Sequence, residues 1–202
     1  MFFKLGYGLR EDPAMFYDLT VRITPEVRKK AEENDRFALA GHLGTHFDSK
    51  RKEFPLDYLR LPAVIFNVSS IRGREITEED IELGLVEPGT FVCFFTGYEK
   101  EFGYGNADYF KDHVVLSNDL LDNLVEKGVH IIGIDAPGVR PGYEHAKRDQ
   151  YCADRGTFIV ENMGGIEQLM QDQTSVECVI NTYPVRFSES DALLCRVVAE
   201  TS

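Results

Sequence analysis

Two histidines and an aspartate fall within the segment 41–48, which reads Gly-His-Leu-Gly-Thr-His-Phe-Asp. Imidazole nitrogen and carboxylate oxygen, without thiolate, are ligands that suit Zn, Mn or Fe in the divalent state. Three protein ligands would leave coordination positions open for water and substrate. The spacing therefore predicts a metal site formed by His42, His46 and Asp48, and the alternative is a surface turn with two solvated histidines.

Neither regular secondary structure would bring these three side chains together. On a strand they would share a face, but at about 3.3 Å per residue the two histidines would lie roughly 13 Å apart, too far to hold one ion. On a helix His42 and His46 would meet, while Asp48 would rotate off their face. Gly44 lies between the histidines and can take backbone angles that other residues avoid, so we expect a bend there.

The pattern His-x-Gly-Thr-His-x-Asp resembles the signature of the cyclase family of metal-dependent hydrolases, which includes bacterial kynurenine formamidase and isatin hydrolase. The likeness continues, in order, over nearly the whole chain. Further segments that resemble family motifs are Tyr17–Thr20, Phe95–Tyr98, Ile132–Asp135, Gly156–Asn162 and Cys195–Ala199. The resemblance implies an α/β protein in which residues 1–202 form a single compact domain similar to the swivelling β/β/α fold of the family.

Two positions depart from the two-metal formamidases of this family. Those relatives have a third histidine ten residues after the first, where this chain has Lys52. They also have a histidine twelve residues before the glutamate that Glu161 matches, where this chain has Asp149. Lysine is a poor ligand, and its charge would repel or replace a second cation. The resemblance thus implies one divalent metal per chain, Zn or Mn, as in relatives similar to isatin hydrolase.

The resemblance also suggests catalytic roles for nearby charged residues. Glu161 would ligate the metal or orient its bound water, and Glu161 or alternatively Asp149 would act as the general base. His145 precedes Asp149 by four residues, so on a helix the two share a face, and a register shift could bring His145 in instead. Lys52 would steady the oxyanion or pair with one of the carboxylates, or else lie in a solvated charged loop.

The function that these residues favour is metal-dependent hydrolysis of an amide or lactone, such as a formamide or cyclic imide, by a metal-activated water. This is formamidase-like chemistry on a small-molecule substrate. Two alternatives stay open. The metal could support a lyase or cyclisation reaction, or the chain could be a non-catalytic relative that binds a small molecule and has lost the second metal site.

Length and composition are those of a compact enzyme domain. The chain has 202 residues, 43% of them hydrophobic, which is enough for one full core. A net charge of -12 and a pI near 4.9 argue against nucleic acid or an anionic membrane as the main partner. The start of the chain does not resemble a signal peptide, and no apolar run could span a bilayer, so we expect a cytoplasmic protein. Four widely separated cysteines predict reduced thiols.

Helices and strands alternate in the predicted pattern. Thr24 and the proline after it predict the start of a helix that runs to about Glu33, and a second helix is expected over 117–127. Buried strands are predicted at three apolar runs, 62–69, 91–96 and 129–134. Asp135 follows the last of these strands, where it could border a site or cap a turn.

Aromatic residues cluster in two places. The segment 98–110 is rich in glycine and aromatic rings, and it could close over a flat substrate or pack on the domain. Near the N-terminus, aromatic residues need an apolar surface to cover them. They are Phe2, Phe3, Tyr7, Phe16 and Tyr17. In the resembled family such surfaces meet between subunits, so a homodimer or homotetramer is expected.

Overall fold

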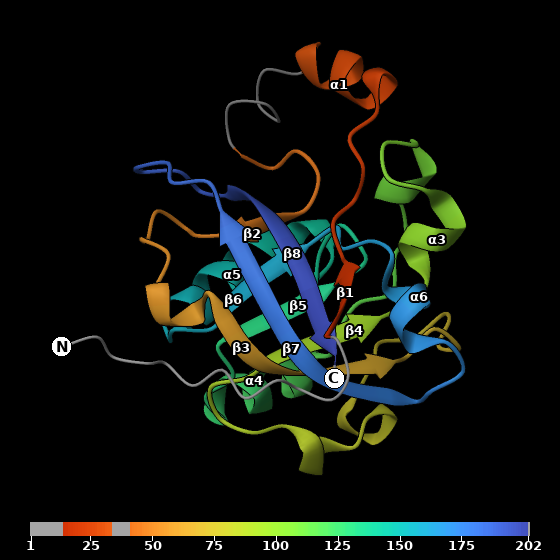
Figure 1. The fold of residues 1–202 in the computed structure, drawn as a ribbon, viewed down its shortest axis with the longest axis vertical. Helices are drawn as coiled ribbons and strands as arrows, with labels where there is room; N and C mark the ends of the chain where they lie inside the picture. The colour runs from red at the N-terminus through yellow and green to blue at the C-terminus, as the bar shows by residue number, and fades with distance from the viewer. Residues whose placement is uncertain (1–13, 34–40, 202) are drawn as a thin grey trace, which may run out of the picture.

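One mixed sheet of eight strands organises the part of the chain that the computed structural model describes, residues 14–33 and 41–201 (Figure 1). The strands are β1 (Met15–Asp18), β2 (His46–Asp48), β3 (Arg60–Asn67), β4 (Phe91–Phe95), β5 (Ile131–Ile134), β6 (Phe158–Glu161), β7 (Ser175–Pro184) and β8 (Leu193–Thr201). Their order is β1-β8-β2-β6-β5-β4-β3-β7, and β7 pairs in turn with β8. Strands β2 to β8 therefore close into a barrel, and β1 pairs with β8 further along the edge that β2 occupies.

Four neighbouring strands of the barrel, β3, β4, β5 and β6, run parallel to one another. Parallel strands are covered on both faces, and every residue of β4 and β5 is accordingly buried. The apolar runs at 62–69, 91–96 and 129–134 are confirmed as strands, with ends that differ by one or two residues. The remaining pairs in the barrel are antiparallel.

Five α-helices accompany the sheet within the described ranges. They are α1 (Pro25–Glu32), α3 (Tyr98–Phe102), α4 (Asn118–Glu126), α5 (Gly142–Ala153) and α6 (Ile166–Met170). Two of them begin where the sequence predicts. The hydroxyl of Thr24 accepts a hydrogen bond from the Val27 amide at the start of α1, and Ser117 caps α4 in the same way through Leu120. Each hydroxyl thus satisfies a backbone donor that the helix itself leaves unpaired.

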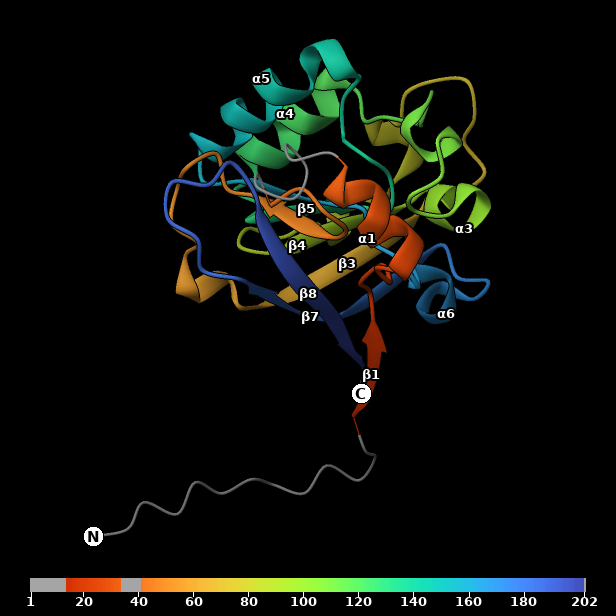
Figure 2. The same cartoon turned by 90° about the horizontal axis from the view of Figure 1, so that it is seen from above.

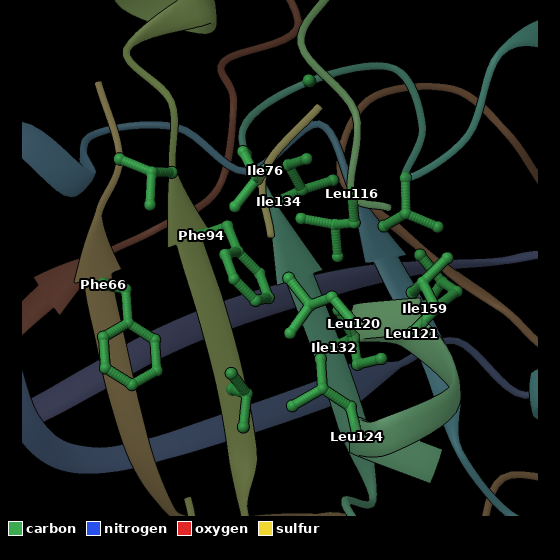
Figure 3. Packing of buried hydrophobic residues seen from close by; sticks show 14 of the residues in the cluster. Phe66, Ile76, Phe94, Leu116, Leu120, Leu121, Leu124, Ile132, Ile134 and Ile159 are labelled. Carbon is green, nitrogen blue, oxygen red and sulfur yellow. The ribbon is translucent and has the colours of Figure 1, made fainter. Parts of the chain in front are cut away.

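Helices α4 and α5 lie side by side over the parallel strands, on the outer face of the barrel (Figure 2). Arg148 of α5 joins them by donating to Asp122 of α4 at 2.8 Å. Leucines of α4 point at the strands, where they pack among apolar side chains of β4, β5 and β6 (Figure 3). The residues in this packing are Leu120, Leu121, Leu124, Phe94, Ile132, Ile134 and Ile159. This layer fixes α5, which carries part of the site described below.

A second apolar cluster fills the interior of the barrel. It contains residues that alternate with those of the outer cluster along the same strands, because successive side chains of a strand point to opposite faces. In β5, for example, Ile131 belongs to the interior cluster and Ile132 to the outer one. Phe47 of β2 also points into the interior and is fully buried. The side chains on either side of Phe47 must therefore face outward, toward α5.

Other expectations concern the membrane, the thiols and the N-terminus. In the ranges that the structure covers, no helix has the length and apolar character needed to cross a bilayer. All four cysteines lie in these ranges as free thiols, three buried and one, Cys178, partly exposed. Phe2, Phe3 and Tyr7 lie outside the described residues, and the expected oligomer stays a prediction.

Candidate metal centre

A bend at Gly44 positions the predicted ligands, as the spacing suggested. Gly44 has a φ of +72°, in the left-handed region that favours glycine. A Cβ added there would lie 2.7 Å from Cδ1 of Ile23, so a larger residue would also have to move that side chain. His42 precedes the bend, whereas His46 and Asp48 occupy the two ends of β2.

The side chains of His42, His46 and Asp48 converge on one point. A ligand atom from each lies within 4.8 Å of the others. Nε2 of His42 is 3.6 Å from Oδ1 of Asp48, and Nε2 of His46 is 3.7 Å from its Oδ2. Donor atoms that share a tetrahedral ion at about 2.1 Å would lie roughly 3.4 Å apart. This spacing fits a common divalent cation.

The ring of His46 is held in the orientation that a ligand requires. Its Nδ1 lies 2.9 Å from the Gly44 carbonyl oxygen, and because a carbonyl only accepts, the ring proton belongs on Nδ1. In the neutral ring Nε2 then carries the lone pair, and it faces the carboxylates of Asp48 and Glu161. In metal-binding histidines, a hydrogen bond from the ring nitrogen that does not bind the metal fixes both the tautomer and the orientation of the ring.

Glu161 reaches the site because β6 pairs with β2. His46 and Glu161 stand directly opposite each other in this antiparallel pair. Oε2 of Glu161 is 3.4 Å from Nε2 of His46, and both side chains are buried. Asp48 lies two residues along the same face, so the ladder brings both carboxylates to one side of the sheet.

Helix α5 contributes two more side chains, His145 and Asp149, which share a face one turn apart. Nε2 of His145 is 2.8 Å from Oε1 of Glu161 and 3.1 Å from Oδ2 of Asp149. Donor atoms of these three residues and of Asp48 all lie within 4.8 Å of one another. The sequence left open which of His145 and Asp149 faces the site, and the structure brings both there.

Of the two placements that the sequence left open for Lys52, the structure shows the solvated loop and not the catalytic centre. Its Nζ lies 2.9 Å from the exposed carboxylate of Asp154, away from the cluster, and more than a third of its side chain is exposed. Lys50 lies at the site instead, two residues after Asp48, and the backbone at 50 and 51, with φ of +48° and +63°, turns the chain before Lys52. Nζ of Lys50 is 3.2 Å from Oδ2 of Asp149 and 3.4 Å from Oδ1 of Asp48. A period of two from His46 through Asp48 to Lys50 could have revealed this residue.

Charges in this buried space shift the pKa of several groups. Burial and the nearby Glu161 raise the pKa of Asp48, whereas burial of Glu161 is outweighed by His145 and His46, which lower its pKa. Burial opposes protonation of the two buried imidazoles, but Asp48 raises the pKa of His46 to about 9, and Glu161 raises that of His145 to about 11. Burial and the adjacent His46 lower the pKa of His42 to about 4, which leaves its imidazole neutral.

Several buried polar atoms of the cluster have no hydrogen-bond partner within the described part of the chain. They are Nε2 of His46, both carboxylate oxygens of Asp48 and of Asp149, and Oε1 of Glu161. Oδ2 of Asp149 and Oε1 of Glu161 lie close to the positively charged groups of Lys50 and His145, but the angles of these contacts are not those of hydrogen bonds. Buried charged atoms without partners are unfavourable, and a divalent cation would coordinate them. The donor set therefore fits the predicted metal.

A surrounding layer that the sequence did not reveal supports the loop. Nδ2 of Asn162 donates to the Gly44 carbonyl at 3.1 Å, and its Oδ1 accepts from the hydroxyl of Tyr109 at 3.0 Å. The Gly44 amide donates to the Tyr104 hydroxyl at 2.7 Å, and Thr45 donates to the Asn162 carbonyl at 2.6 Å. Tyr109 is fully buried. Part of the aromatic segment 98–110 thus packs on the domain and braces the loop that carries His42 and His46.

Asp135 and Cys152 lie outside the cluster. The carboxylate of Asp135 accepts hydrogen bonds from the Thr96 amide at 2.7 Å, the Thr96 hydroxyl at 2.6 Å and the Gly97 amide at 2.8 Å. It closes the turn after β4, which is the capping role that the sequence allowed. Cys152 is fully buried, and burial raises the pKa of its thiol to about 12, so it packs as an apolar residue.

Comparison with protein families identifies the class to which the fold and site belong. The model of the Cyclase family matches residues 17–141, more than half of the sequence, and the chain belongs to this family. The matched region begins within β1 and contains the bend at Gly44 and strands β2 to β5. It ends just before α5, so His145, Asp149 and Glu161 lie beyond it. A search of curated protein sequences gave no match.

Solved structures share the fold. One described as a potential metal-dependent hydrolase with cyclase activity has a TM-score of 0.73 at 22% identity, over 94% of this chain and 99% of that one. A predicted metal-dependent hydrolase from Bacillus stearothermophilus has a TM-score of 0.68 at 21% identity, with the same coverage. Isatin hydrolase A from Labrenzia aggregata, bound to benzyl benzoate, has a TM-score of 0.68 at 17% identity, over 93% and 94%. The α/β fold expected from the sequence is confirmed.

Proposed function

We propose that this member of the Cyclase family is a metal-dependent hydrolase that opens an amide or lactone bond in a small substrate, such as a formamide or a cyclic imide. The observation that carries the proposal is the convergence of His42, His46 and Asp48 at the spacing of a shared cation, where Nε2 of His46 and both oxygens of Asp48 are buried without a hydrogen-bond partner among the described residues. The names of structures with the same fold, metal-dependent hydrolase and isatin hydrolase, support it.

The three residues of the contiguous motif would hold the cation. Glu161 would be a fourth ligand or the acceptor of a hydrogen bond from a coordinated water, because its Oε2 lies beside Nε2 of His46. Nitrogen and oxygen donors of this kind suit Zn and Mn. When bound, the cation lowers the pKa of a water ligand toward neutrality and polarises a substrate carbonyl.

Glu161 and Asp149 are the carboxylates placed to move a proton. A carboxylate within hydrogen-bond reach can take the proton of the attacking water and return it to the leaving nitrogen or oxygen. We assign this step to Glu161, which borders the proposed cation position. Asp149 takes the step if Glu161 is held as a ligand, since an oxygen of Asp149 belongs to the cluster and neither of its oxygens has a hydrogen-bond partner in the described chain.

An apolar cavity beside the loop would accommodate part of a small substrate. It has a volume of about 170 Å³, and its walls include Val27, Leu43, Tyr104 and Phe110. Leu43 directly follows His42 in the chain and the Tyr104 hydroxyl accepts from the Gly44 amide, so the cavity lies against the loop that carries His42. Aliphatic and aromatic walls suit a flat apolar group, whose polar end would then point toward the ligands.

The test begins with metal content. Protein purified without chelator should contain about one Zn or Mn per chain by plasma mass spectrometry, and His42→Ala should lose it. N-formyl amides, cyclic imides and lactones would then be screened by product mass. A gain of one water indicates hydrolysis, whereas a product without added water indicates lyase chemistry. Protein that binds no metal even after reconstitution would overturn the proposal in favour of a non-catalytic binder.

A further inference from the structure

A second set of donors adjoins the first. Asp48, His145, Asp149 and Glu161 offer ligand atoms within 4.8 Å of one another, and Asp48 belongs to both sets. Asp48, Asp149 and Glu161 are almost completely buried, Oδ2 of Asp149 lies 3.1 Å from Nε2 of His145, and neither oxygen of Asp149 has a hydrogen-bond partner in the chain as described. Taken alone, these four side chains could hold a second cation next to the first, with the carboxylate of Asp48 shared between the two.

A protein cation already lies in this second set. Nζ of Lys50 is 3.2 Å from Oδ2 of Asp149 and 3.4 Å from Oδ1 of Asp48, and only 11% of the lysine side chain is exposed. A divalent ion on the same two oxygens would lie within a few ångströms of Nζ. Like charges at that distance repel strongly in a buried site.

The charges of the cluster agree with one metal rather than two. Asp48, Asp149 and Glu161 together supply three negative charges when ionised. With His42 and His46 neutral, one divalent cation, the ammonium group of Lys50 and the protonated ring of His145, which does not ligate this cation, supply four positive charges, an excess of one. Two divalent cations beside the same ammonium group, with all three imidazoles neutral, would leave an excess of two positive charges in a space screened from water.

We propose that the ammonium group of Lys50 occupies the second cation position and limits this protein to one metal ion, held by His42, His46 and Asp48. This inference rests on the proposed metal site. Lys50 has a second effect, because it holds the carboxylate of Asp149 beside Asp48 and so positions the alternative proton acceptor. Lys50 is thus a positioning residue, and it sets the metal number of the site.

Metal stoichiometry tests the inference directly. Wild-type protein, Lys50→Gln and Lys52→Gln would each be dialysed against excess Mn, freed of unbound ion and measured by plasma mass spectrometry. The wild type and Lys52→Gln should hold about one ion per chain, while Lys50→Gln should approach two. Lys50→Arg keeps the charge and should stay near one. Circular dichroism and thermal melting would confirm that each variant is folded.

Electron paramagnetic resonance separates a shared site from stray surface binding. Two Mn ions that share the Asp48 carboxylate couple magnetically, so Lys50→Gln should show a coupled spectrum that is absent from the wild type and from Lys52→Gln. Two ions in the wild type, or a folded Lys50→Gln that stays at one ion, would overturn the inference and leave the proposed hydrolase intact. A wild type without metal would overturn both.

Discussion

The two halves of the metal centre arise from the sequence in different ways. His42, His46 and Asp48 come from a few consecutive residues, and one glycine bend is enough to turn them together. The other half combines the end of β2 with a face of α5 and the end of β6. In the contiguous half, the local backbone sets most of the geometry of the side chains. In the other half, called the assembled half below, the geometry depends on how elements distant in sequence pack together. The predictions below test whether the two halves also differ in function.

Loss of a ligand from the contiguous half should have the largest effect. His46→Ala removes the buried Nε2 that faces both Asp48 and Glu161, so we expect loss of bound metal. The fall in kcat/KM should exceed the roughly 10- to 100-fold cost of losing an outer-layer partner. His130→Gln is a matched control, because His130 stacks on Tyr58 with ring centroids 4.0 Å apart, outside the cluster. A His46→Ala protein with normal metal and turnover would disprove the site.

Substitution of carboxylates in the assembled half should affect turnover more than metal content. Glu161→Gln should lower kcat by about 100- to 10,000-fold, the usual contribution of a general acid and base. Asp149→Asn should have a smaller effect if Glu161 moves the proton. Single-turnover kinetics with metal content measured in parallel would rank the two variants. A larger loss in Asp149→Asn would exchange their roles, and full activity in both would contradict the assignment.

The bracing residue Asn162 should have an intermediate effect. Its φ of +54° suits glycine, so Asn162→Gly removes the side chain without straining the backbone. The Gly44 carbonyl and the ring of His46 would lose a neighbour, and metal affinity should fall by about 10- to 100-fold. Competition with a chromophoric chelator measures this change. Unchanged affinity would show that the bend holds His46 without help.

The metal-free protein should lose stability as pH rises. Burial opposes protonation of His145, but Glu161 and Asp149 raise its pKa to about 11 in the folded state, above the ordinary value of 6.5. Because the folded-state pKa is the higher one, this stabilisation is complete below about pH 6.5 and is lost as pH rises toward 11. The thermal midpoint of the metal-free protein, measured with chelator present, should decrease as the pH is raised from about 7 to 10.

His145→Gln provides the control for this trend, since His145 is the imidazole whose pKa differs most between the folded state and its ordinary value. Its midpoint should change less steeply with pH than that of the wild type, and the residual slope would come from His46, whose pKa is raised to about 9. Metal-loaded protein should behave differently, because a bound ion takes the place of the imidazole protons and dissociates on acidification. A midpoint of the metal-free protein that rises with pH would contradict the proposed charge arrangement.

The smallest effect is expected at Lys52. Its ion pair with Asp154 is solvent-exposed, and exposed pairs contribute little to stability. Lys52→Ala should therefore leave metal content, turnover and thermal midpoint unchanged. A large loss of activity in Lys52→Ala would restore the role that the sequence suggested for this residue and would weaken the case for Lys50.

The sequence predicted those features that depend on local pattern. Apolar runs predicted the buried strands, Thr24 predicted the start of α1, and the spacing around Gly44 predicted the bend that brings His42, His46 and Asp48 together. Lys52 was misplaced because a left-handed turn at 50 and 51 carries it outward, and lysine and arginine seldom signal such a turn. Asn162 was missed because its role depends on the pairing of β6 with β2, which no local pattern encodes.

The shortness of β2 has a consequence for folding. This strand has three residues and is held by β6 on one side and β8 on the other, with His46 opposite both Glu161 and Leu194. The ligands near residue 42 leave the ribosome early, yet β2 gains its second neighbour only when β8, the last strand, has been made. Contacts so distant in sequence form slowly. Capture of the ion should therefore be a late event in folding, and the rate of metal uptake by refolding protein would report closure of the barrel.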